Sequence, residues 1–425
     1  MAHIKQVLQS KLALNWLVLF SIQIFNMILA FAYFPFLLAK LGVAYFGELA
    51  TFIALCQILI ILTDYGLNFY GQKMVAECNE DKVKLFDIFI SVTAIRLTLS
   101  GLYFVAVAGA LTAIKGWNNF DLKLYGACFI AVISNAIYFQ WFMQGLQSFF
   151  KLAFIQVISR LLIFGLMLIF VKDSGDLYFA ALLQASPLIV ASALGAPDLF
   201  RLFSKINRVW PTAQNLRLHL SAGRATFAST VLNVLYTSAG TFIIGIFYSA
   251  NSAGIYFLSE KIIRSVQALH APLVHAGIAR STQLFLSDKS GFRSFGRIQT
   301  ILIGAIFLAI SMTIFLASDF IRDIFFRGET EEFGKMLALM AFIPAFGAMS
   351  GSIGYLILMP QGDIRYLVYA QSAAFVVFAA LFVPIISRFD VIGIAALATI
   401  VEFTAFSTLI VLILIKSFSK RAIDL

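Results

Sequence analysis

Long apolar segments alternate with short polar ones along almost the whole chain. Each apolar segment is about 20 residues or longer, the helix length that crosses a hydrocarbon core about 30 Å thick. Helices are predicted rather than a barrel, because the strict alternation of barrel strands is absent. The expected spans are 12–36, 46–70, 86–112, 124–146, 151–171, 177–199, 224–248, 253–282, 298–318, 336–359, 365–386 and 391–415.

The composition agrees with a chain that lives in lipid. Hydrophobic residues make up 61% of the 425 residues and charged residues only 12%, against roughly a quarter in ordinary soluble domains. A globular protein could not bury so much apolar surface. The predicted fold class is therefore an all-α integral membrane protein with twelve transmembrane helices.

Basic residues in the loops predict the orientation. If the N-terminus is cytoplasmic, 19 Lys and Arg residues lie in cytoplasmic loops and 8 in outer loops. This bias predicts that both termini are cytoplasmic. The net charge of +10 is then mainly a topology signal, and no nucleic-acid partner is expected. The first span lacks a cleavage site and is expected to remain as an anchor.

The longest polar interval among the predicted cytoplasmic loops is 200–222, which follows six spans. It predicts an N-terminal six-helix lobe in residues 1–205 and a C-terminal six-helix lobe in 206–425. An even number of spans in each lobe would make any repeat a parallel one. A weak similarity between two connections supports a repeat: the first connection has Gly47 beside Phe46, and the seventh has Gly254 near Tyr256. Such turns with a glycine and an aromatic residue also occur by chance.

Span 253–282 carries one polar stripe. Glu260, Arg264, Gln267 and His275 fall on one helical face, and Lys261 lies beside it. Ionisable groups at bilayer depth are costly and usually face an aqueous cavity or a partner. The alternative is a self-neutralised Glu260–Arg264 pair near an interface, with Lys261 extending its ammonium to water.

Two arginines lie near the middle of other spans. Arg96 is in span 86–112, and Arg160 is halfway along 151–171 on one face with Gln156. Each is a candidate to meet an anionic ligand in a cavity. The alternative for Arg96 is an ion pair with Asp64 or Glu402, which are themselves candidates for ion coupling or for charge pairing.

The fourth span ends in an amide-rich face with Gln140 and Gln144. Amides in spans commonly bond neighbouring helices, and lining a cavity is the other interpretation. Cations outnumber acids among the residues inside the spans, which favours an anionic headgroup. Guanidinium groups suit phosphate because they present forked donors in fixed geometry.

Several classes of function lack their motifs. The chain has no phosphate-binding Gly-x-x-x-x-Gly-Lys-Ser/Thr loop and no metal-binding cluster of His, Cys and Asp. Cys56, Cys78 and Cys128 are far apart in sequence, so we expect isolated, buried, inert thiols and not a disulfide framework. No metal or organic cofactor is expected.

Four segments, in order along the whole chain, resemble one known family. LGVAYFGELATF with DYGLNFYGQKMVA (41–76) resembles the opening signature of polysaccharide repeat-unit flippases (Wzx-like). YFQWFMQGLQSFFKLAFIQVISRLL (138–162) is similar to their Trp-Phe-x-Gln-Gly element, and 253–285 to their Gly-x-Tyr…Glu-Lys-Ile helix with proline. IRDIFFRGETEEFGK is similar to their Phe-x-Gly turn. The family often has a second proline where this chain reads Ile278-Ala-Arg-Ser281, which puts a kink there in doubt.

This family belongs to the multidrug/oligosaccharidyl-lipid/polysaccharide exporter superfamily. The resemblance implies two six-helix lobes around a central basic cavity, in a protein of the bacterial inner membrane. It implies that the protein flips undecaprenyl-pyrophosphate-linked oligosaccharides, O-antigen units included, to the periplasmic leaflet by alternating access. It implies coupling to H+ or Na+, and a polysaccharide polymerase and chain-length regulator as partners. The candidates to bind substrate are Arg96, Arg160, Lys261, Arg264, Gln140, Gln144 and His275; those for ion coupling or charge pairing are Asp64, Glu260 and Glu402.

Two other interpretations of the function remain open. The same scaffold could export a drug or the peptidoglycan lipid precursor, although a drug exporter should have more acid than base in its cavity. A membrane polysaccharide polymerase would require a large outer loop, and the longest candidate, 319–335, is short and net acidic.

Overall fold

A computed structural model describes residues 2–78, 81–115, 121–204, 206, 211–326, 330–363 and 365–423. Every element in these residues is a helix. Their bounds are α1 Ala2–Asp64, α2 Leu67–Glu77, α3 Lys82–Lys115, α4 Leu122–Ile137, α5 Gln140–Gly145, α6 Phe149–Phe170, η2 Ser174–Asp176, α7 Leu177–Ala185, α8 Pro187–Phe203, α9 Ala213–Phe247, α10 Ala250–Ala268, α11 His270–Ser287, α12 Lys289–Leu316, α13 Ser318–Phe326, α14 Glu331–Met340, α15 Ile343–Ser352, η3 Ile353–Leu358 and α16 Arg365–Ile423.

Eight stretches of the described chain are long and apolar enough to cross a membrane, judged by length and composition. They are Phe20–Asp64, Lys82–Ala113, Lys123–Gly145, Phe149–Phe170, Ser174–Phe203, Lys289–Leu316, Glu331–Leu358 and Arg365–Lys416. The predicted spans 224–248 and 253–282 lie on α9, α10 and α11, outside these eight. The number twelve therefore stays a prediction.

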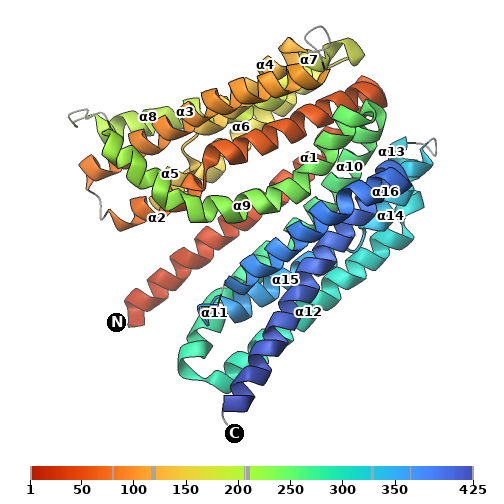
Figure 1. The fold of residues 1–425 in the computed structure, drawn as a ribbon. Coiled ribbons are helices and arrows are strands. Elements are labelled where there is room, and N and C mark those ends of the chain that lie inside the picture. Colours follow the sequence, from red (N-terminus) through yellow and green to blue (C-terminus); the bar gives the residue numbers. More distant parts are fainter. Residues whose placement is uncertain are drawn as a thin grey trace. The chain divides into compact units, whose positions relative to one another are not determined.

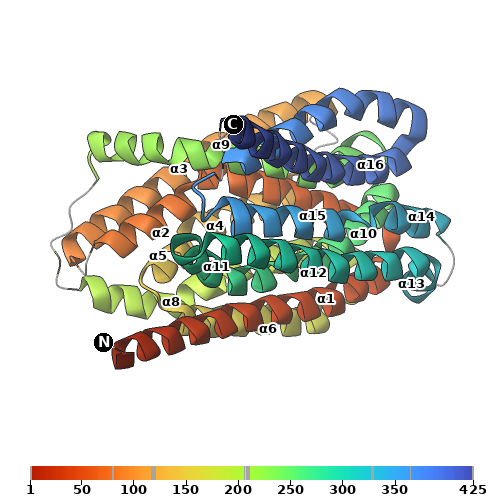
Figure 2. The same ribbon diagram turned by 90° about the horizontal axis from the view of Figure 1, so that it is seen from below.

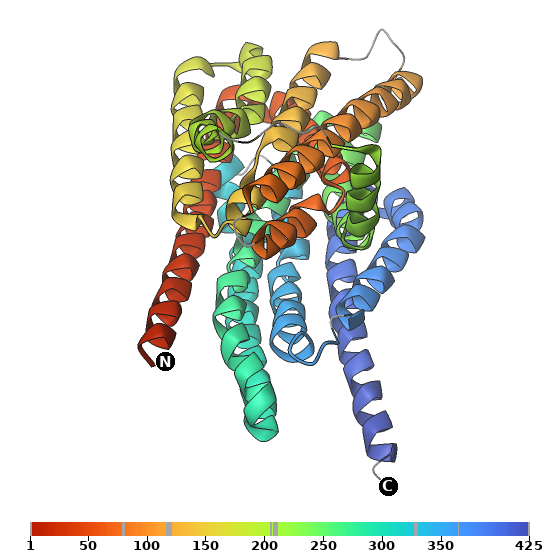
Figure 3. The ribbon, with the colours of Figure 1, turned by 90° about the vertical axis from the view of Figure 1, so that its left-hand side faces the viewer.

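Two of the eight stretches reverse direction within one helical element. The backbone of α1 leaves the helical region at Gly42 (φ 74°, ψ 167°), and that of α16 does so at Asp390 (φ 56°, ψ −150°). Glycine adopts positive φ without steric cost, and aspartate tolerates it better than most residues. Both reversals fall in connections predicted from sequence, so α1 and α16 each cover two predicted spans. Figures 2 and 3 show the two arms of α16, in blue, folded back on each other.

The described chain divides into two units. Unit 1 comprises Met1–Phe25, Ala32–Val234 and Thr241–Asn251, and unit 2 comprises Asn26–Phe31, Leu235–Gly240 and Ser252–Leu425. This division groups most of α9 with the N-terminal helices, whereas the sequence predicted a boundary between residues 205 and 206.

In unit 1, α2 and α5 approach each other at backbone distance. A Cβ atom on Gly71 would lie 2.6 Å from Cε3 of Trp141, and one on Gly145 would lie 2.6 Å from Cβ of Val75. Trp141 is only 1% exposed and belongs to a large buried cluster of this unit. Both glycines are therefore required for this contact. On the other side of the unit, α4 and α7 lie side by side (Figure 1).

In unit 2, α11, α12 and α15 lie side by side (Figure 2). Val274, Phe307 and Ala348 form part of the buried cluster between them. Asp288 caps the start of α12, where it accepts a bond from the backbone N–H of Ser290. The backbone N–H of Gly291 and the hydroxyl of Ser290 hold the pKa of Asp288 below its usual range, so this cap stays charged.

Candidate functional site

A polar site of unit 2 joins α10 and α16. Nη1 of Arg264 donates to Oε1 of Gln267 at 2.7 Å and to Oε1 of Glu402 at 3.3 Å. Nε2 of Gln267 donates to the same oxygen of Glu402 at 2.6 Å. The three side chains therefore form a closed ring in which one carboxylate oxygen accepts from both partners. We call these three residues and His270 the Arg264 cluster.

The local sequence explains why the ring can form. Arg264 and Gln267 are three positions apart on α10, so they project from one face. Gly347 on α15 leaves space for them: a Cβ there would lie 1.8 Å from Nε2 of Gln267 and 3.0 Å from Oε1 of Glu402. Any side chain larger than hydrogen at this position would displace the amide.

His270, the first residue of α11, extends the cluster. Its Nδ1 lies 2.6 Å from the backbone carbonyl of Gln267. A carbonyl oxygen only accepts, so Nδ1 carries the hydrogen of this bond. Gly351 makes room for the opposite edge of the ring, since a Cβ there would lie 2.7 Å from Nε2. The π-helical turn η3 follows within two residues, and such turns are frequent at functional sites.

The exposure of this ion pair distinguishes it from a core salt bridge. The side chain of Arg264 is 22% exposed and that of Glu402 is 10% exposed. The guanidinium is a fork of five donors, and part of it is open at its surface. An anionic ligand could compete with Glu402 for it.

In unit 1, Arg96 is paired with Asp64. Nη2 of Arg96 donates to Oδ1 of Asp64, and the two side chains are 2% and 12% exposed. Asp64 ends α1, and Arg96 lies near the middle of α3. Of the two interpretations of Arg96, this geometry favours the ion pair over a ligand contact.

A second polar group of unit 1 joins α4, α5 and α6. Nε2 of Gln156 lies 3.2 Å from the hydroxyl of Tyr138 and 3.1 Å from Oε1 of Gln140. Arg160 is half-buried one turn further along α6, and Gln144 is half-buried on α5. We call Tyr138, Gln140, Gln156 and Arg160 the Gln156 cluster.

Tyr33 and Gln184 were not among the predicted site residues. The hydroxyl of Tyr33 donates to Oε1 of Gln184, which joins α1 to α7. The only sequence signal was one neutral polar side chain in each of two apolar spans.

The remaining predicted residues lie on α10 and α11, two of the three helices that form the Arg264 cluster. Nζ of Lys261 lies 5.0 Å from the ring centre of Phe257, a cation–π arrangement. Glu260 is 8% exposed. His275 is on α11, and its side chain is outside the part of the chain that the structure describes.

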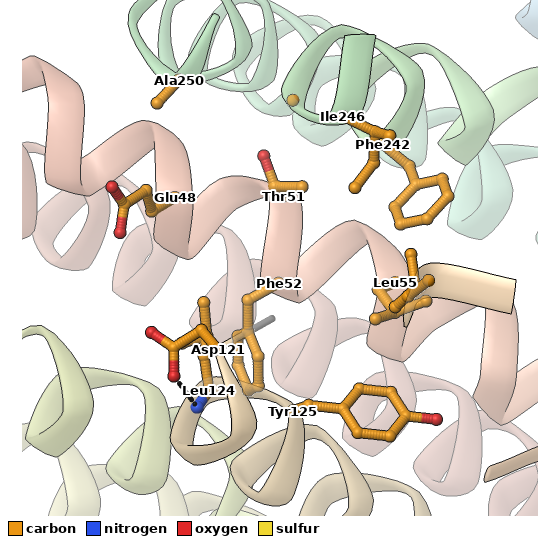
Figure 4. Close-up of a pocket in the computed structure, with 12 residues that line it drawn as sticks. Glu48, Thr51, Phe52, Leu55, Asp121, Leu124, Tyr125, Phe242, Ile246 and Ala250 are labelled. Carbon is orange, nitrogen blue, oxygen red and sulfur yellow. Dashed lines mark hydrogen bonds between the residues drawn. The ribbon is translucent and has the colours of Figure 1, made fainter. Parts of the chain in front are cut away.

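A pocket of about 350 Å³ opens among α1, α4 and α9 within unit 1. Figure 4 shows the carboxylates of Glu48 and Asp121 towards one end and the rings of Tyr125 and Phe242 towards the other. Asp121 accepts bonds from two backbone N–H groups at the start of α4 and from the hydroxyl of Tyr178 at 2.7 Å. Two carboxylates repel phosphate, so this pocket does not suit an anionic headgroup.

The expectation of isolated cysteines is wrong for two of the three. Sγ of Cys56 on α1 lies 3.0 Å from Sγ of Cys128 on α4, and both are buried free thiols. Their separation of 72 positions in sequence concealed this, because linear spacing does not report which helices pack together.

Comparison with known proteins identifies relatives over most of the chain. Residues 12–280 match the profile of the family described as "Polysaccharide biosynthesis protein". The chain is 26% identical over 279 residues to a "Putative O-antigen transporter" of Escherichia coli K12, covering 65% of this chain and 66% of the relative, just under two thirds. It is 20% identical over 353 residues to a protein of the same name from Shigella dysenteriae, covering 83% and 87%.

Solved structures of transporters share the fold. An inward-closed lipid II flippase, MurJ, superimposes with a TM-score of 0.69 at 14% identity, covering 94% of this chain and 87% of its own. An inward-facing multidrug resistance transporter of the MOP superfamily gives 0.66 at 14% identity, covering 94% and 99%. At such low identity the likeness shows the fold alone. Together with the apolar helices, this likeness shows that the chain is a multi-pass membrane protein with the fold that these transporters share.

Proposed function

This chain belongs to the family of polysaccharide biosynthesis proteins, and we propose that it flips undecaprenyl-pyrophosphate-linked oligosaccharide repeat units. The units would pass from the cytoplasmic to the periplasmic leaflet of the bacterial inner membrane by alternating access, with both termini in the cytoplasm. The names of the two O-antigen transporter relatives support the substrate class. A polysaccharide polymerase and a chain-length regulator would act on the product.

The observation that carries this proposal is the Arg264 cluster. A partly exposed guanidinium that contacts the carboxylate of Glu402 and the amide of Gln267 can exchange this carboxylate for pyrophosphate oxygens. The forked donors of arginine match phosphate geometry. Gln267 would keep Glu402 hydrogen-bonded while Arg264 engages the substrate.

Glu402 is our candidate for ion coupling. Once pyrophosphate takes Arg264, the carboxylate loses its cation and can accept H+ or Na+. Asp64 is unsuited to this role, because Arg96, whose side chain is only 2% exposed and cannot reach a ligand, already neutralises it. Arg160 and Lys261 would add positive charge along the path of the substrate, and Gln140 and Gln144 would meet sugar hydroxyls.

Arg264→Ala tests the proposal, with Arg280→Ala as its control. Arg280 is exposed on the neighbouring helix α11. Removing a phosphate contact made during transport should lower export by at least about tenfold, so lipid-linked oligosaccharide should accumulate and surface polysaccharide should fall. Arg264→Lys should recover part of the activity, because it keeps the charge and loses the fork.

Membrane levels of each variant must be measured alongside. Normal surface polysaccharide in Arg264→Ala at normal protein level would reject the proposed site. Equal loss in Arg280→Ala would show that the assay reports positive charge in general.

One observation favours a second candidate, the export of an organic cation. The pocket in Figure 4 combines Glu48 and Asp121 with aromatic rings, the usual partners of an ammonium group. Deletion of the gene would then raise sensitivity to cationic drugs, and Glu48→Gln would reproduce that change. Under the flippase proposal, drug sensitivity stays unchanged while surface polysaccharide is lost.

A further inference from the structure

A second hollow in unit 1 is almost entirely apolar. It has a volume of about 710 Å³ and lies among α3, the end of α4 and α8. Five phenylalanines line it, with Ser192 and Ser204 as its hydroxyl groups; they are Phe86, Phe89, Phe139, Phe200 and Phe203. We call this hollow the phenylalanine groove. It shares no residue with the Arg264 cluster or with the pocket in Figure 4.

Close packing at one wall holds the groove in shape. A Cβ atom on Gly195 of α8 would lie 2.4 Å from Cζ of Phe139, so the ring of Phe139 lies directly against the backbone of Gly195. The ring of Phe203 packs edge-on against that of Phe86 at 5.2 Å and tilted against that of Phe89 at 5.7 Å. Interlocked rings have few alternative rotamers, which makes collapse into the hollow costly.

The rim of the groove is apolar and open. Phe200 is 71% exposed and Ile137 is 44% exposed. Two of the three lining segments, the start of α3 and the end of α8, lie where the sequence predicts the cytoplasmic side, and the end of α4 lies near the middle of the predicted span 124–146. An apolar rim at this depth lets a hydrocarbon chain enter sideways from the bilayer.

Two exposed cations are close in sequence to residues that line the groove. Lys82 is four positions before Phe86 on α3, so it lies on the same face one turn closer to the helix start, and it is exposed. Arg201 follows Phe200 on the last turn of α8 and is also exposed. A hydrocarbon slot with positive charge at one end is complementary to an amphiphile with an anionic head. The hydroxyl-poor lining would leave the hydroxyls of a sugar unpaired.

We propose that the phenylalanine groove is a loading site for the isoprenoid chain of the lipid-linked substrate, with its phosphates beside Lys82 and Arg201. This rests on the proposed function, because that function supplies a polyprenyl pyrophosphate at the cytoplasmic leaflet. The chain segment next to the pyrophosphate lies in the groove before the headgroup reaches the Arg264 cluster. Branched methyl groups pack against the flat faces of the five rings.

Photolabelling tests the site without requiring transport. Full-length protein in nanodiscs is irradiated with a photoreactive polyprenyl diphosphate, and the labelled peptides are mapped by mass spectrometry. Label is expected on residues 86–90 and 192–206. Ala196→Phe fills the groove and should reduce this label by at least roughly tenfold. Ala106→Phe, the same change at an exposed position of α3, should leave it intact.

A second variant covers the case in which Ala196→Phe fails to fold. Lys82→Gln combined with Arg201→Gln changes only exposed side chains and should weaken labelling by about tenfold, an effect that salt reduces. A photoreactive phosphatidylglycerol serves as the competing lipid. Equal labelling of the groove by it, or unchanged polyprenyl labelling in both variants, overturns the inference.

The outcomes separate this inference from the proposed function. If Ala196→Phe loses the label but still exports polysaccharide normally, the groove does not load substrate and the flippase proposal stands. If Arg264→Ala exports normally while the groove still binds polyprenyl diphosphate, the proposed transport site is wrong, and the groove is still a binding site for the isoprenoid chain.

Discussion

Each unit of this protein holds an arginine–carboxylate pair inside its helices, and the two pairs differ in how closed they are. Arg96 and Asp64 in unit 1 have side chains 2% and 12% exposed and bond directly. Arg264 and Glu402 in unit 2 are 22% and 10% exposed and share Gln267 between them. The first pair is sealed in the core, and the second has an open side and a third partner.

The difference shows that charge at membrane depth is not by itself the sign of a binding site. A sealed pair neutralises itself, and its contribution is to the folded state. In the open pair, the arginine can exchange its carboxylate for an anionic ligand while Gln267 stays hydrogen-bonded to that carboxylate. Neither charged group is then left without a polar partner. We therefore propose a structural role for Arg96 and a transport role for Arg264, and the following changes test this distinction.

Asp64→Ala should have the largest effect on stability. It leaves the Arg96 guanidinium buried without its carboxylate, which costs about 3–5 kcal/mol. Thermal unfolding of the purified protein in detergent would show the loss. The double variant Asp64→Leu with Arg96→Met should recover most of it, because apolar pairs replace buried ion pairs well. Export by the stable double variant would show that Arg96 does not bind substrate; an unaltered unfolding temperature in Asp64→Ala would contradict the sealed pair.

Gly347→Ala should destabilise unit 2 by about 2 kcal/mol, a typical cost of overpacking. The new methyl group would collide with the amide of Gln267 and open the ring that holds Glu402. Export should fall together with the unfolding temperature. Gly101→Ala is the control, since a Cβ there meets nothing within 4 Å. If both variants behave alike, the close approach at Gly347 is not needed.

Glu402→Gln should change stability by only about 1 kcal/mol, because the amide oxygen can still accept from Gln267. Export should nevertheless fall strongly, since a glutamine cannot alternate between a cation and a coupling ion. The measurements are the unfolding temperature and the surface polysaccharide of the same strain. A stability loss as large as that of Asp64→Ala would place this pair in the structural class too.

Sequence reasoning located the two reversals well, at Gly42 and Asp390, because breaks between apolar runs are local features. It could not choose between Asp64 and Glu402 as the partner of Arg96. Helical periodicity gives the face on which a residue lies, but it does not say which helices meet. Arg264 and Glu402 are 138 positions apart, and only tertiary packing brings them together.

The space around the site was equally hidden from the sequence. Gly347 and Gly351 are needed because Gln267 and His270 lie directly against them. The sequence does not show which side chains lie against a glycine in an apolar span. Tyr33 and Gln184 carry no charge, so the sequence did not indicate the hydrogen bond that they form between α1 and α7. The sequence analysis selected charged side chains because they are costly in lipid, and this cost does not report whether a residue belongs to the site.

Oxidation of Cys56 and Cys128 should have the smallest effect on stability and is the most direct test of how unit 1 packs. Their sulfur atoms are 3.0 Å apart on α1 and α4, so copper phenanthroline should accept two electrons while two protons are released, which leaves one internal disulfide. A maleimide–polyethylene glycol gel shift would then count one reactive thiol, Cys78, instead of three in the denatured protein. Cys56→Ser should block the change, while Cys78→Ser should not. Since the two side chains are already in contact between α1 and α4, the cross-link should not disturb export. A loss of export on oxidation would mean that α1 and α4 move apart during transport, and that unit 1 is less closed than its ion pair indicates.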